Sequence, residues 1–320
     1  MLNWIKKGLI FKPDGTRSWM KTHAQVPCTV ELDNVLRTYF STREQIDEHG
    51  MFRSYSGFVD LDKNDLSKVI NVSQSPIVPL GGKGEFDEFG SMAGSVIYHE
   101  GEYLLYYCGW TRCQSVPYNW AIGLATSQDG VTFRRCGPGP LLGPALNEPF
   151  LQACPLVYKI AKDDWHMFYL SGVKWFEHAG KPESQYLLMH ARSQDGFNWM
   201  RDGKVIIPPV VPDECQTSAS IVQMNGRFVM LFCYRHGSEF REKSEKGYRI
   251  GCATSTDLLT WHRDDSNAGL VVSQSGWDSE MVAYPHVFDL NGQIHMFYCG
   301  NHFGKEGFGW ATLGQVQRSV

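Results

Sequence analysis

A strand–turn–strand pattern recurs along this chain at intervals of about 62 to 67 residues. Three copies share one form, in which Ser-x-Asp is followed by a short turn and then by an aromatic residue. These copies are centred on Asp129, Asp195 and Asp257. Weaker copies end at Asp62 and occupy residues 307–313. Self-similarity at a fixed period indicates a repeat architecture in which each copy is one supersecondary unit.

Strand-forming sequence precedes each copy of the pattern. An aromatic strand lies ahead of every copy, at residues 38–40, 105–107, 167–169, 231–234 and 296–298. Another strand and a tight turn precede four of these; the turns include Glu100-Gly101, Asn225-Gly226 and Asn291-Gly292, and such turns favour hairpins. Each repeat is therefore predicted to be an antiparallel sheet of about four strands. Five such sheets around one axis predict an all-β fold, a five-bladed β-propeller.

The two ends of the chain complement each other. The fifth repeat stops near Val320, after its third strand, whereas residues 3–11 match the fourth-strand pattern of residues 198–206. We therefore expect residues 3–11 to pair with the strand at 308–312, which would leave no open sheet edge and lock the ring. Residues 1–320 then form one domain, with blades over about 18–75, 84–142, 147–209, 213–272 and 277–320 plus 1–12.

Composition excludes several classes of function. Lys plus Arg number 30 and Asp plus Glu number 34, so a net charge of −4 leaves no basic footprint for nucleic acid. No apolar run approaches the ~18–20 residues of a membrane span, and the N-terminus lacks signal-peptide features. The nine cysteines show no paired spacing, so free thiols in the cytoplasm are expected. The sequence also lacks phosphate-cradling loops, dinucleotide fingerprints and Gly-x-Ser-x-Gly elbows.

Acidic residues gather at the predicted starts of the innermost strands. When the apolar runs are aligned, Glu88, Glu148, Asp213 and Asp278 fall in one column. The loops that enter the inner strands of a propeller converge on one mouth of its channel, so four carboxylates are expected there. Solvated turn residues are the alternative. Like charges held close raise one pKa and produce an acid beside an ionised base, the equipment for glycosidic-bond chemistry.

Seven segments along the chain carry a family resemblance: His23-Ala-Gln-Val-Pro27, Tyr39-Phe-Ser-Thr-Arg43, Gly84-Glu-Phe-Asp87, Val116-Pro-Tyr118, Glu148-Pro149, Tyr248-Arg-Ile-Gly251 and Trp277-Asp-Ser-Glu-Met-Val-Ala-Tyr-Pro285. In these segments the chain resembles a bacterial group of five-bladed propellers. That group is related to the arabinanase, xylosidase, invertase and levansucrase superfamily, glycoside hydrolase families 32, 43 and 68. The resemblance covers the whole chain.

The resemblance implies catalytic roles for acids at the inner-strand starts. Glu148 matches the acid of the third blade, and Asp87 or Glu88 could be the helper of the second. The first blade departs from the family, because it offers His23 and Gln25 where the base or nucleophile should stand. Either the site does not perform ordinary hydrolysis, or the base is an acid of a later blade, of which there are three candidates: Glu214, Asp278 and Glu280.

Aromatic and basic residues complete the candidate site. Three aromatic side chains are candidates for stacking on a sugar ring, with inter-blade core as the alternative: Trp110, Tyr118 and Trp175. Three arginines either balance the acids or hold a carboxylate or phosphate of the substrate: Arg43, Arg235 and Arg249. His286, together with His23, is a candidate for a channel metal, with a hydrogen-bonded core residue as the alternative.

Three hypotheses follow for the function. The first is a cytoplasmic enzyme that acts on a glycosidic bond in glycan or sugar-nucleotide metabolism, with a carbohydrate or sugar-nucleotide ligand, an anionic group on that ligand, and no cofactor. The second is a glycosyltransferase or phosphorylase on the same fold, in which phosphate or a nucleotide replaces water. The third is a non-catalytic propeller that binds a glycan or a protein. The absent first-blade acid favours the third hypothesis, and the four remaining acids oppose it.

Overall fold

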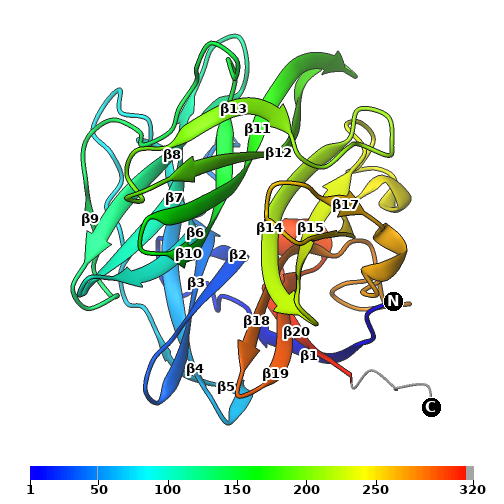
Figure 1. The fold of residues 1–320 in the computed structure, drawn as a ribbon. Helices are drawn as coiled ribbons and strands as arrows, with labels where there is room; N and C mark the ends of the chain where they lie inside the picture. Colours follow the sequence, from blue (N-terminus) through cyan, green and yellow to red (C-terminus); the bar gives the residue numbers. More distant parts are fainter. Residues whose placement is uncertain (49, 315–320) are drawn as a thin grey trace.

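The structure, a computed structural model, describes residues 1–48 and 50–314, so the end of the last predicted blade lies outside the described residues. The strands fall into five groups, called units here (Figure 1). The first unit contains β2 (Thr22–Glu31), β3 (Val35–Arg43), β4 (Ser54–Asp62) and β5 (Asp65–Val72). The second contains β6 (Gly90–His99), β7 (Glu102–Arg112), β8 (Tyr118–Ser127) and β9 (Arg134–Arg135).

The later units repeat this plan. The third contains β10 (Gln152–Ala161), β11 (Asp164–His178), β12 (Lys181–Ser193) and β13 (Met200–Val205). The fourth contains β14 (Cys215–Met224), β15 (Arg227–Arg235), β16 (Arg249–Ser255) and β17 (His262–Arg263). The fifth contains β18 (Ala283–Leu290), β19 (Gln293–Cys299), β20 (Phe308–Leu313) and β1 (Trp4–Phe11). The helical segments are short: η1 (Ser244–Lys246), η2 (Asp265–Asn267) and α1 (Asn301–Gly304).

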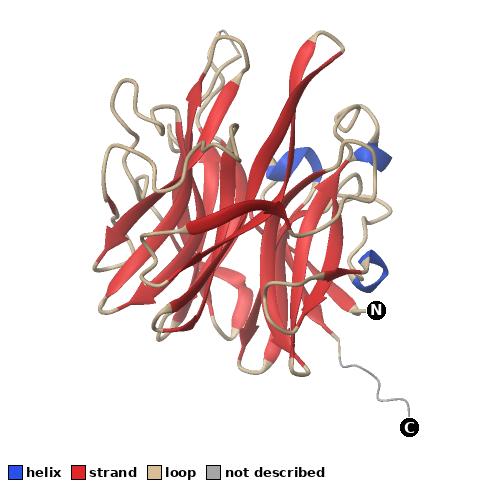
Figure 2. Ribbon diagram, turned by 45° about the horizontal axis from the view of Figure 1, so that its top comes forward, coloured by secondary structure: helices blue, strands red, loops and turns tan. Residues whose placement is uncertain are grey.

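Each unit is an antiparallel sheet, and its first strand faces the first strands of its neighbours. β2 contacts β6, β6 contacts β10, β10 contacts β14, β14 contacts β18, and β18 contacts β2. These first strands gather near the middle of the molecule in Figure 1, and Figure 2 shows the sheets standing side by side. A single parallel bridge, Ser54 to Gly90, joins the first unit to the second. As the sequence predicts, β1 pairs antiparallel with β20, from Trp4 opposite Leu313 to Phe11 opposite Phe308.

The repeated Ser-x-Asp motif is the turn after the third strand of a unit. In the third unit, the Asp195 carboxylate accepts the backbone N–H groups of Phe197 and Asn198 at 2.8 and 2.7 Å. These hydrogen bonds lower the pKa of Asp195, and Asp257 has the same arrangement. The turn also joins units, because the Tyr106 hydroxyl of β7 donates to the carbonyl of Gly196 at 3.0 Å.

The apolar core lies between neighbouring sheets. Tyr39 of β3 and Tyr107 of β7 share one buried cluster, and Tyr106 of β7 and Trp165 of β11 share the next. Adjacent residues of an aromatic strand thus pack against opposite neighbours, as the period-2 alternation of a strand requires. A glycine of the third strand makes room for these rings: a Cβ on Gly123 would lie 2.5 Å from Cζ of Tyr107. Among the described residues, no helix is long and apolar enough to cross a membrane.

Candidate functional site

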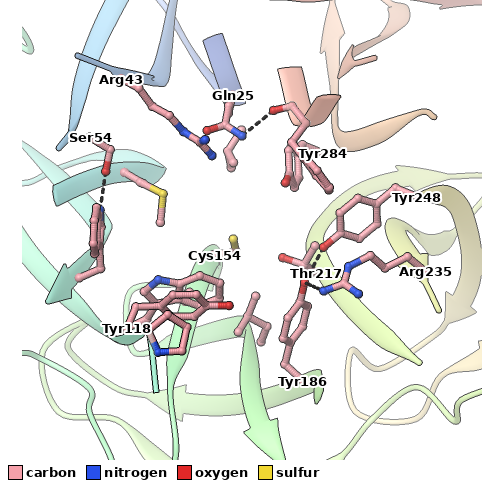
Figure 3. A pocket seen from close by; sticks show the side chains of 18 of the residues that line it. Gln25, Arg43, Ser54, Tyr118, Cys154, Tyr186, Thr217, Arg235, Tyr248 and Tyr284 are labelled. Atoms are coloured by element: carbon pink, nitrogen blue, oxygen red, sulfur yellow. Dashed lines mark hydrogen bonds between the residues drawn. The ribbon is translucent and has the colours of Figure 1, made fainter. Parts of the chain in front are cut away.

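A cavity of about 440 Å³ lies where the units meet, a size typical of small-molecule sites (Figure 3). Its polar and aromatic lining comes from every unit: Gln25, Arg43, Phe52, Ser54, Trp110, Tyr118, Trp120, Cys154, Tyr186, Thr217, Arg235, Phe240, Arg241, Tyr248, Tyr284 and Phe303. Arg43, Trp110, Tyr118 and Arg235 were expected at the site. Among the described lining residues there is no aspartate or glutamate.

Strained backbone recurs in the first strands, next to this cavity. The first strands carry a non-glycine residue with positive φ at corresponding positions, of which four are found: Val26, Cys154, Ser218 and Tyr284, with φ of 51°, 50°, 52° and 54°. The pairing register shifts at each of these positions, which marks a β-bulge. Such strain costs on the order of 1–3 kcal/mol per residue and is concentrated at functional sites. Three of the four residues, Val26, Cys154 and Tyr284, line the cavity, so strained backbone forms part of its wall.

Arg43 and Arg235 occupy the last positions of the second strands β3 and β15, and both reach the cavity. The Arg43 guanidinium lies over the ring of Phe52, at 4.4 Å from the ring centroid. Within the described part of the chain, no acceptor hydrogen-bonds that guanidinium. Burial lowers the pKa of Arg43, because no carboxylate beside it compensates for the lost water. Arg43 therefore presents to the cavity a guanidinium that no described carboxylate pairs.

Arg235 is held by three aromatic rings. Its guanidinium lies 3.5 Å from the ring centroid of Phe240. The ring centroids of Tyr186 and Tyr248 are farther away, at 5.4 and 5.5 Å. The guanidinium donates to the Tyr186 hydroxyl at 3.0 Å, and the hydroxyls of Tyr186 and Tyr248 are 2.6 Å apart. Arg235 Nε is buried and has no hydrogen-bond partner in the described residues. Burial raises the pKa of both tyrosines, so both hydroxyls keep their protons.

Arg241 is the third arginine in the lining, and it differs from the other two because it has a carboxylate partner. It is exposed, and its guanidinium donates to the buried carboxylate of Glu183 on β12. This ion pair lies at the side of the cavity that also contains Tyr118, since Glu183 is followed by Ser184, whose hydroxyl lies 3.3 Å from that of Tyr118. The charge of Arg241 is therefore compensated within the protein.

Aromatic side chains of the second unit form a platform in the cavity. Tyr118 and Trp120 stack with ring centroids 4.6 Å apart and an interplanar angle of 8°. Trp175 packs edge-on against Tyr118 at 5.4 Å and supports it without lining the cavity. Trp110 lines the cavity and donates from its indole N–H to Ser54 at 2.6 Å. Flat faces of this kind match the apolar face of a sugar ring.

The structure does not bring the predicted acids together at the cavity. Four buried carboxylates instead lie inside separate units, and we call them the inner-strand carboxylates: Asp87, Glu148, Glu214 and Asp278. Each is bound by a cation from the fourth strand of its own unit; the pairs are Asp87–Arg135 at 3.0 Å, Glu148–Arg201 at 3.4 Å, Glu214–Arg263 at 2.6 Å and Asp278–Lys6 at 2.6 Å. Paired cations and buried surroundings therefore explain these positions structurally.

Tyrosines of the second strands complete three of these pairs. Tyr107 donates to Asp87 at 2.7 Å, Tyr169 to Glu148 at 3.0 Å, and Tyr298 to Asp278 at 3.0 Å. Burial raises the pKa of Asp87, while Tyr107 and Arg135 act in the opposite direction. The first unit lacks the arrangement. There Phe40, which pairs with Gly57 as Tyr107 pairs with Gly123, packs with the buried Met20.

In two units the buried acid is the residue adjacent to the one that the sequence alignment predicted. Asp87 occupies the buried position where Glu88 was expected, and Glu214 occupies it instead of Asp213. Glu88 caps the backbone N–H of Gly84 at 2.8 Å, and Asp213 forms an exposed ion pair with Lys174. Side chains of adjacent residues in extended backbone point in opposite directions. Only one acid of each adjacent pair, Asp87 of Asp87–Glu88 and Glu214 of Asp213–Glu214, is therefore buried. Glu280 is exposed and contributes no side chain to the cavity.

The remaining candidates do not line the cavity. Arg249 donates to the carbonyls of Tyr248, Glu280 and Ser244. His286 is half-buried, and its Nε2 accepts the backbone N–H of Thr29 at 3.1 Å. His23 is buried near Arg43, and burial lowers its pKa to about 3. The described residues contain no cluster of three His, Cys, Asp or Glu side chains that could hold a metal.

Several lining residues were not predicted from the sequence. Tyr186, Tyr248, Tyr284, Phe240 and Phe303 all reach the cavity. Tyr248 and Tyr284 lie within segments that carried the family resemblance, which was the only available signal. Phe240 lies in a turn and Phe303 in the short α1, neither of which has a repeat pattern, so periodicity could not single them out.

Comparison with known proteins identifies relatives over nearly the whole chain. Two uncharacterized proteins of Mycobacterium tuberculosis, MT1551 of strain CDC 1551 and Rv1502 of strain H37Rv, are 34% identical to this chain over 312 residues. The match covers 97% of this chain and 99% of each relative. The chain belongs to the family of these two proteins. No family model matches it.

Solved structures share the fold of this family. The BT0996 complex with RGII has a TM-score of 0.76 at 18% identity, and the match covers 100% of this chain and 94% of that protein. A thermostable family-43 glycoside hydrolase has a TM-score of 0.67 at 12% identity, and the match covers 97% of this chain and 95% of that protein. A structure from the GH130 family of mannoside phosphorylases has a TM-score of 0.67 at 12% identity, and the match covers 97% of this chain and 93% of that protein. The fold is that of the β-propeller glycoside hydrolases, as the sequence resemblance implies.

Proposed function

We propose that this protein binds a carbohydrate with an anionic group in the central cavity. The observation that carries the proposal is the lining itself, which has three arginines, an aromatic platform and no carboxylate among its described residues. Stacked rings suit a sugar, and an open guanidinium suits a carboxylate or phosphate. The fold supports the same class of ligand, because the similar structures named above are carbohydrate-processing proteins.

We also propose that residues 1–320 form one five-bladed propeller, with the five units as blades and β1 closing the ring. The cyclic contacts of the first strands and the pairing of β1 with β20 support this arrangement. All nine cysteines are free thiols, which supports a reducing compartment such as the cytoplasm.

Calorimetric titration tests the binding proposal. Neutral disaccharides, uronic acids, sugar phosphates and sugar nucleotides are each titrated into the full chain at equal ionic strength. We expect charged ligands to bind and Arg43→Gln to weaken them about 10- to 100-fold, since a hydrogen bond to a charged group contributes roughly 1.5–3 kcal/mol. Lys204→Gln, which removes an exposed cation on β13, is the matched control. Preference for neutral sugars, or an unchanged affinity in Arg43→Gln, would contradict the proposal.

Chemistry at a glycosidic bond is the second candidate function, and the similarity to glycoside hydrolases and phosphorylases favours it. In the hydrolase form, Glu148 is the acid and Glu214, Asp278 or Glu280 the base, with Asp87 as helper. This form requires Glu148 to leave Tyr169 and Arg201 and to reach the cavity. In the transferase or phosphorylase form, phosphate or a nucleotide held by the arginines replaces water.

Glu148→Gln separates the hydrolase form from a purely structural role. General acid catalysis contributes about 10²–10⁴-fold, so turnover on a ligand found by titration should fall by that factor while its affinity is kept. A variant with reduced stability but full turnover would leave Glu148 outside the mechanism. An absence of turnover on every bound ligand favours a binding protein.

A further inference from the structure

The charges around the cavity do not cancel. Arg43, Arg235 and Arg241 are the charged residues of the described lining, and arginine remains protonated in proteins. Glu183 pairs with Arg241 and removes one of these charges. Two guanidinium charges, those of Arg43 and Arg235, are left without a carboxylate partner in the described part of the chain.

An unpaired charge away from water is costly, so this arrangement favours an anion. The inner-strand carboxylates do not compensate Arg43 and Arg235, because each is already paired with a cation of its own unit. Lys305 adds positive charge near Arg43, since both lie close enough to His23 to lower its pKa. The cavity therefore has a charge of +2 that a ligand can compensate.

The tyrosine pair adds a hydrogen-bond donor to these cations. Tyr186 accepts from Arg235 and shares one hydroxyl–hydroxyl hydrogen bond with Tyr248. Two hydroxyls have two protons, and the bond between them uses one. Whichever tyrosine donates, the other keeps a proton for another acceptor. Arg235 and this hydroxyl are thus neighbouring donors, and Arg43 faces them from the opposite side of the cavity (Figure 3), an arrangement that suits an oxyanion with several acceptor oxygens.

We propose that the anionic group of the ligand is a doubly charged phosphate, bound by Arg235 and the Tyr186–Tyr248 pair, with Arg43 compensating its second charge from the opposite side of the cavity (Figure 3). The inference rests on the proposed function and narrows its substrate class to a phosphorylated sugar, or to a sugar together with free phosphate. A phosphate monoester has a charge of about −1.5 to −2 at pH 7, which matches the cavity. A uronic acid has one negative charge and leaves one guanidinium uncompensated.

The test titrates sodium phosphate, glucose 1-phosphate and glucuronate into the full chain at pH 7.5 and equal ionic strength. Inorganic phosphate is the deciding probe because it needs no correct sugar. We expect phosphate to bind at least about 10-fold more tightly than glucuronate. If glucose 1-phosphate binds more tightly than phosphate, the natural ligand is a phosphorylated sugar. If the two bind equally and compete with each other, the natural ligand is free phosphate beside a sugar.

Two substitutions with opposite expected effects check the charge count. Arg43→Gln should weaken phosphate binding about 10-fold, because it removes a charge that attracts the phosphate across the cavity. Glu183→Gln should strengthen it about 2- to 10-fold, because it frees the charge of Arg241. Tyr248→Phe should weaken it by less than Arg43→Gln, and Lys204→Gln should leave it unchanged. Opposite signs for Arg43→Gln and Glu183→Gln cannot arise from a general loss of folding.

The outcomes separate this inference from the broader one. If glucuronate binds as well as phosphate, or if Glu183→Gln does not strengthen phosphate binding, the phosphate assignment is wrong while the anionic-carbohydrate site stands. If neutral disaccharides bind and no anion does, both proposals fail. If phosphate binds but no sugar or sugar phosphate does, the phosphate site stands and the carbohydrate function fails.

Discussion

Two sets of charged side chains near the centre of this protein follow opposite rules. The inner-strand carboxylates recur in four units, and a fourth-strand cation binds each of them. The cavity arginines Arg43 and Arg235 occupy repeated backbone positions but have no carboxylate partner among the described residues. In the first set, one carboxylate–cation pair recurs in each of four units and joins the segment before the first strand to the fourth strand of that unit. In the second, the pairing is missing, and a ligand can supply it.

The first unit shows that the carboxylate pairs are one of two solutions to the same packing problem. Met20 and Phe40 are buried there with 1% and 0% of their surface exposed, without any charge. Apolar packing can therefore replace the pair within one fold. The comparison predicts that cations of the pairs matter for stability, whereas cations of the cavity matter for binding.

Deletion of residues 1–12 should have the largest effect. It removes β1, exposes the edge of β20, and leaves Asp278 without Lys6. It also removes the buried rings of Trp4 and Phe11, and truncating one such ring typically costs about 3–5 kcal/mol. We expect the truncated chain to melt far below the full chain or to fail to fold. Lys6→Met in the full chain isolates the ion pair, and an unchanged melting temperature in the truncation would refute a structural role for β1.

Removal of one paired cation should have the next largest effect. Arg263 and Glu214 have side chains only 4% and 0% exposed, and breaking a buried pair on one side costs about 3–5 kcal/mol. Urea denaturation of Arg263→Gln should show a loss of that order. The double variant Glu214→Met with Arg263→Met, which imitates the first unit, should recover part of it. A loss below about 1 kcal/mol in the single variant would place these pairs with ordinary surface ion pairs.

The turn aspartates should cause a smaller, pH-dependent effect. Backbone hydrogen bonds lower the pKa of Asp257 from 3.8 to about 2. Across that window the unfolded chain binds more protons than the folded one, so the stabilisation is present above pH 4 and lost as pH falls toward 2. Asp257→Asn keeps an acceptor oxygen without the charge. Its urea midpoint should lie below that of the wild type at pH 7 and approach it at pH 3; a constant difference would contradict this assignment.

Removal of a cavity cation should have the smallest effect on stability. Arg43→Gln deletes a charge that no carboxylate compensates, so without ligand its unfolding free energy should fall by no more than about 0.5 kcal/mol, and removal of the unpaired charge acts to raise it. Comparison with Arg263→Gln in the same denaturation series provides the contrast. A loss similar to that of Arg263→Gln would mean that Arg43 belongs to the structural set, and the distinction between the two sets would fail.

Periodicity predicted the parts of the fold that repeat. The spacing of Asp129, Asp195 and Asp257 located turns whose carboxylates bind backbone, and the match between residues 3–11 and 198–206 predicted the pairing of β1 with β20. It also located the acids near the inner strands. It could not choose between Asp87 and Glu88, or between Asp213 and Glu214, because adjacent acids look alike in a sequence and differ only in the side they face.

The sequence by itself determined the repeat, the strands and the residue types available at their ends, because strand alternation and turn chemistry act over a few neighbouring residues. Only the tertiary structure decided which charges are paired. Arg263 reaches Glu214 across 49 residues, and Lys6 reaches Asp278 across 272. The same packing brings Arg235 among Tyr186, Phe240 and Tyr248. Charge compensation depends on distances through space, and these exist only once the sheets have packed around their common centre.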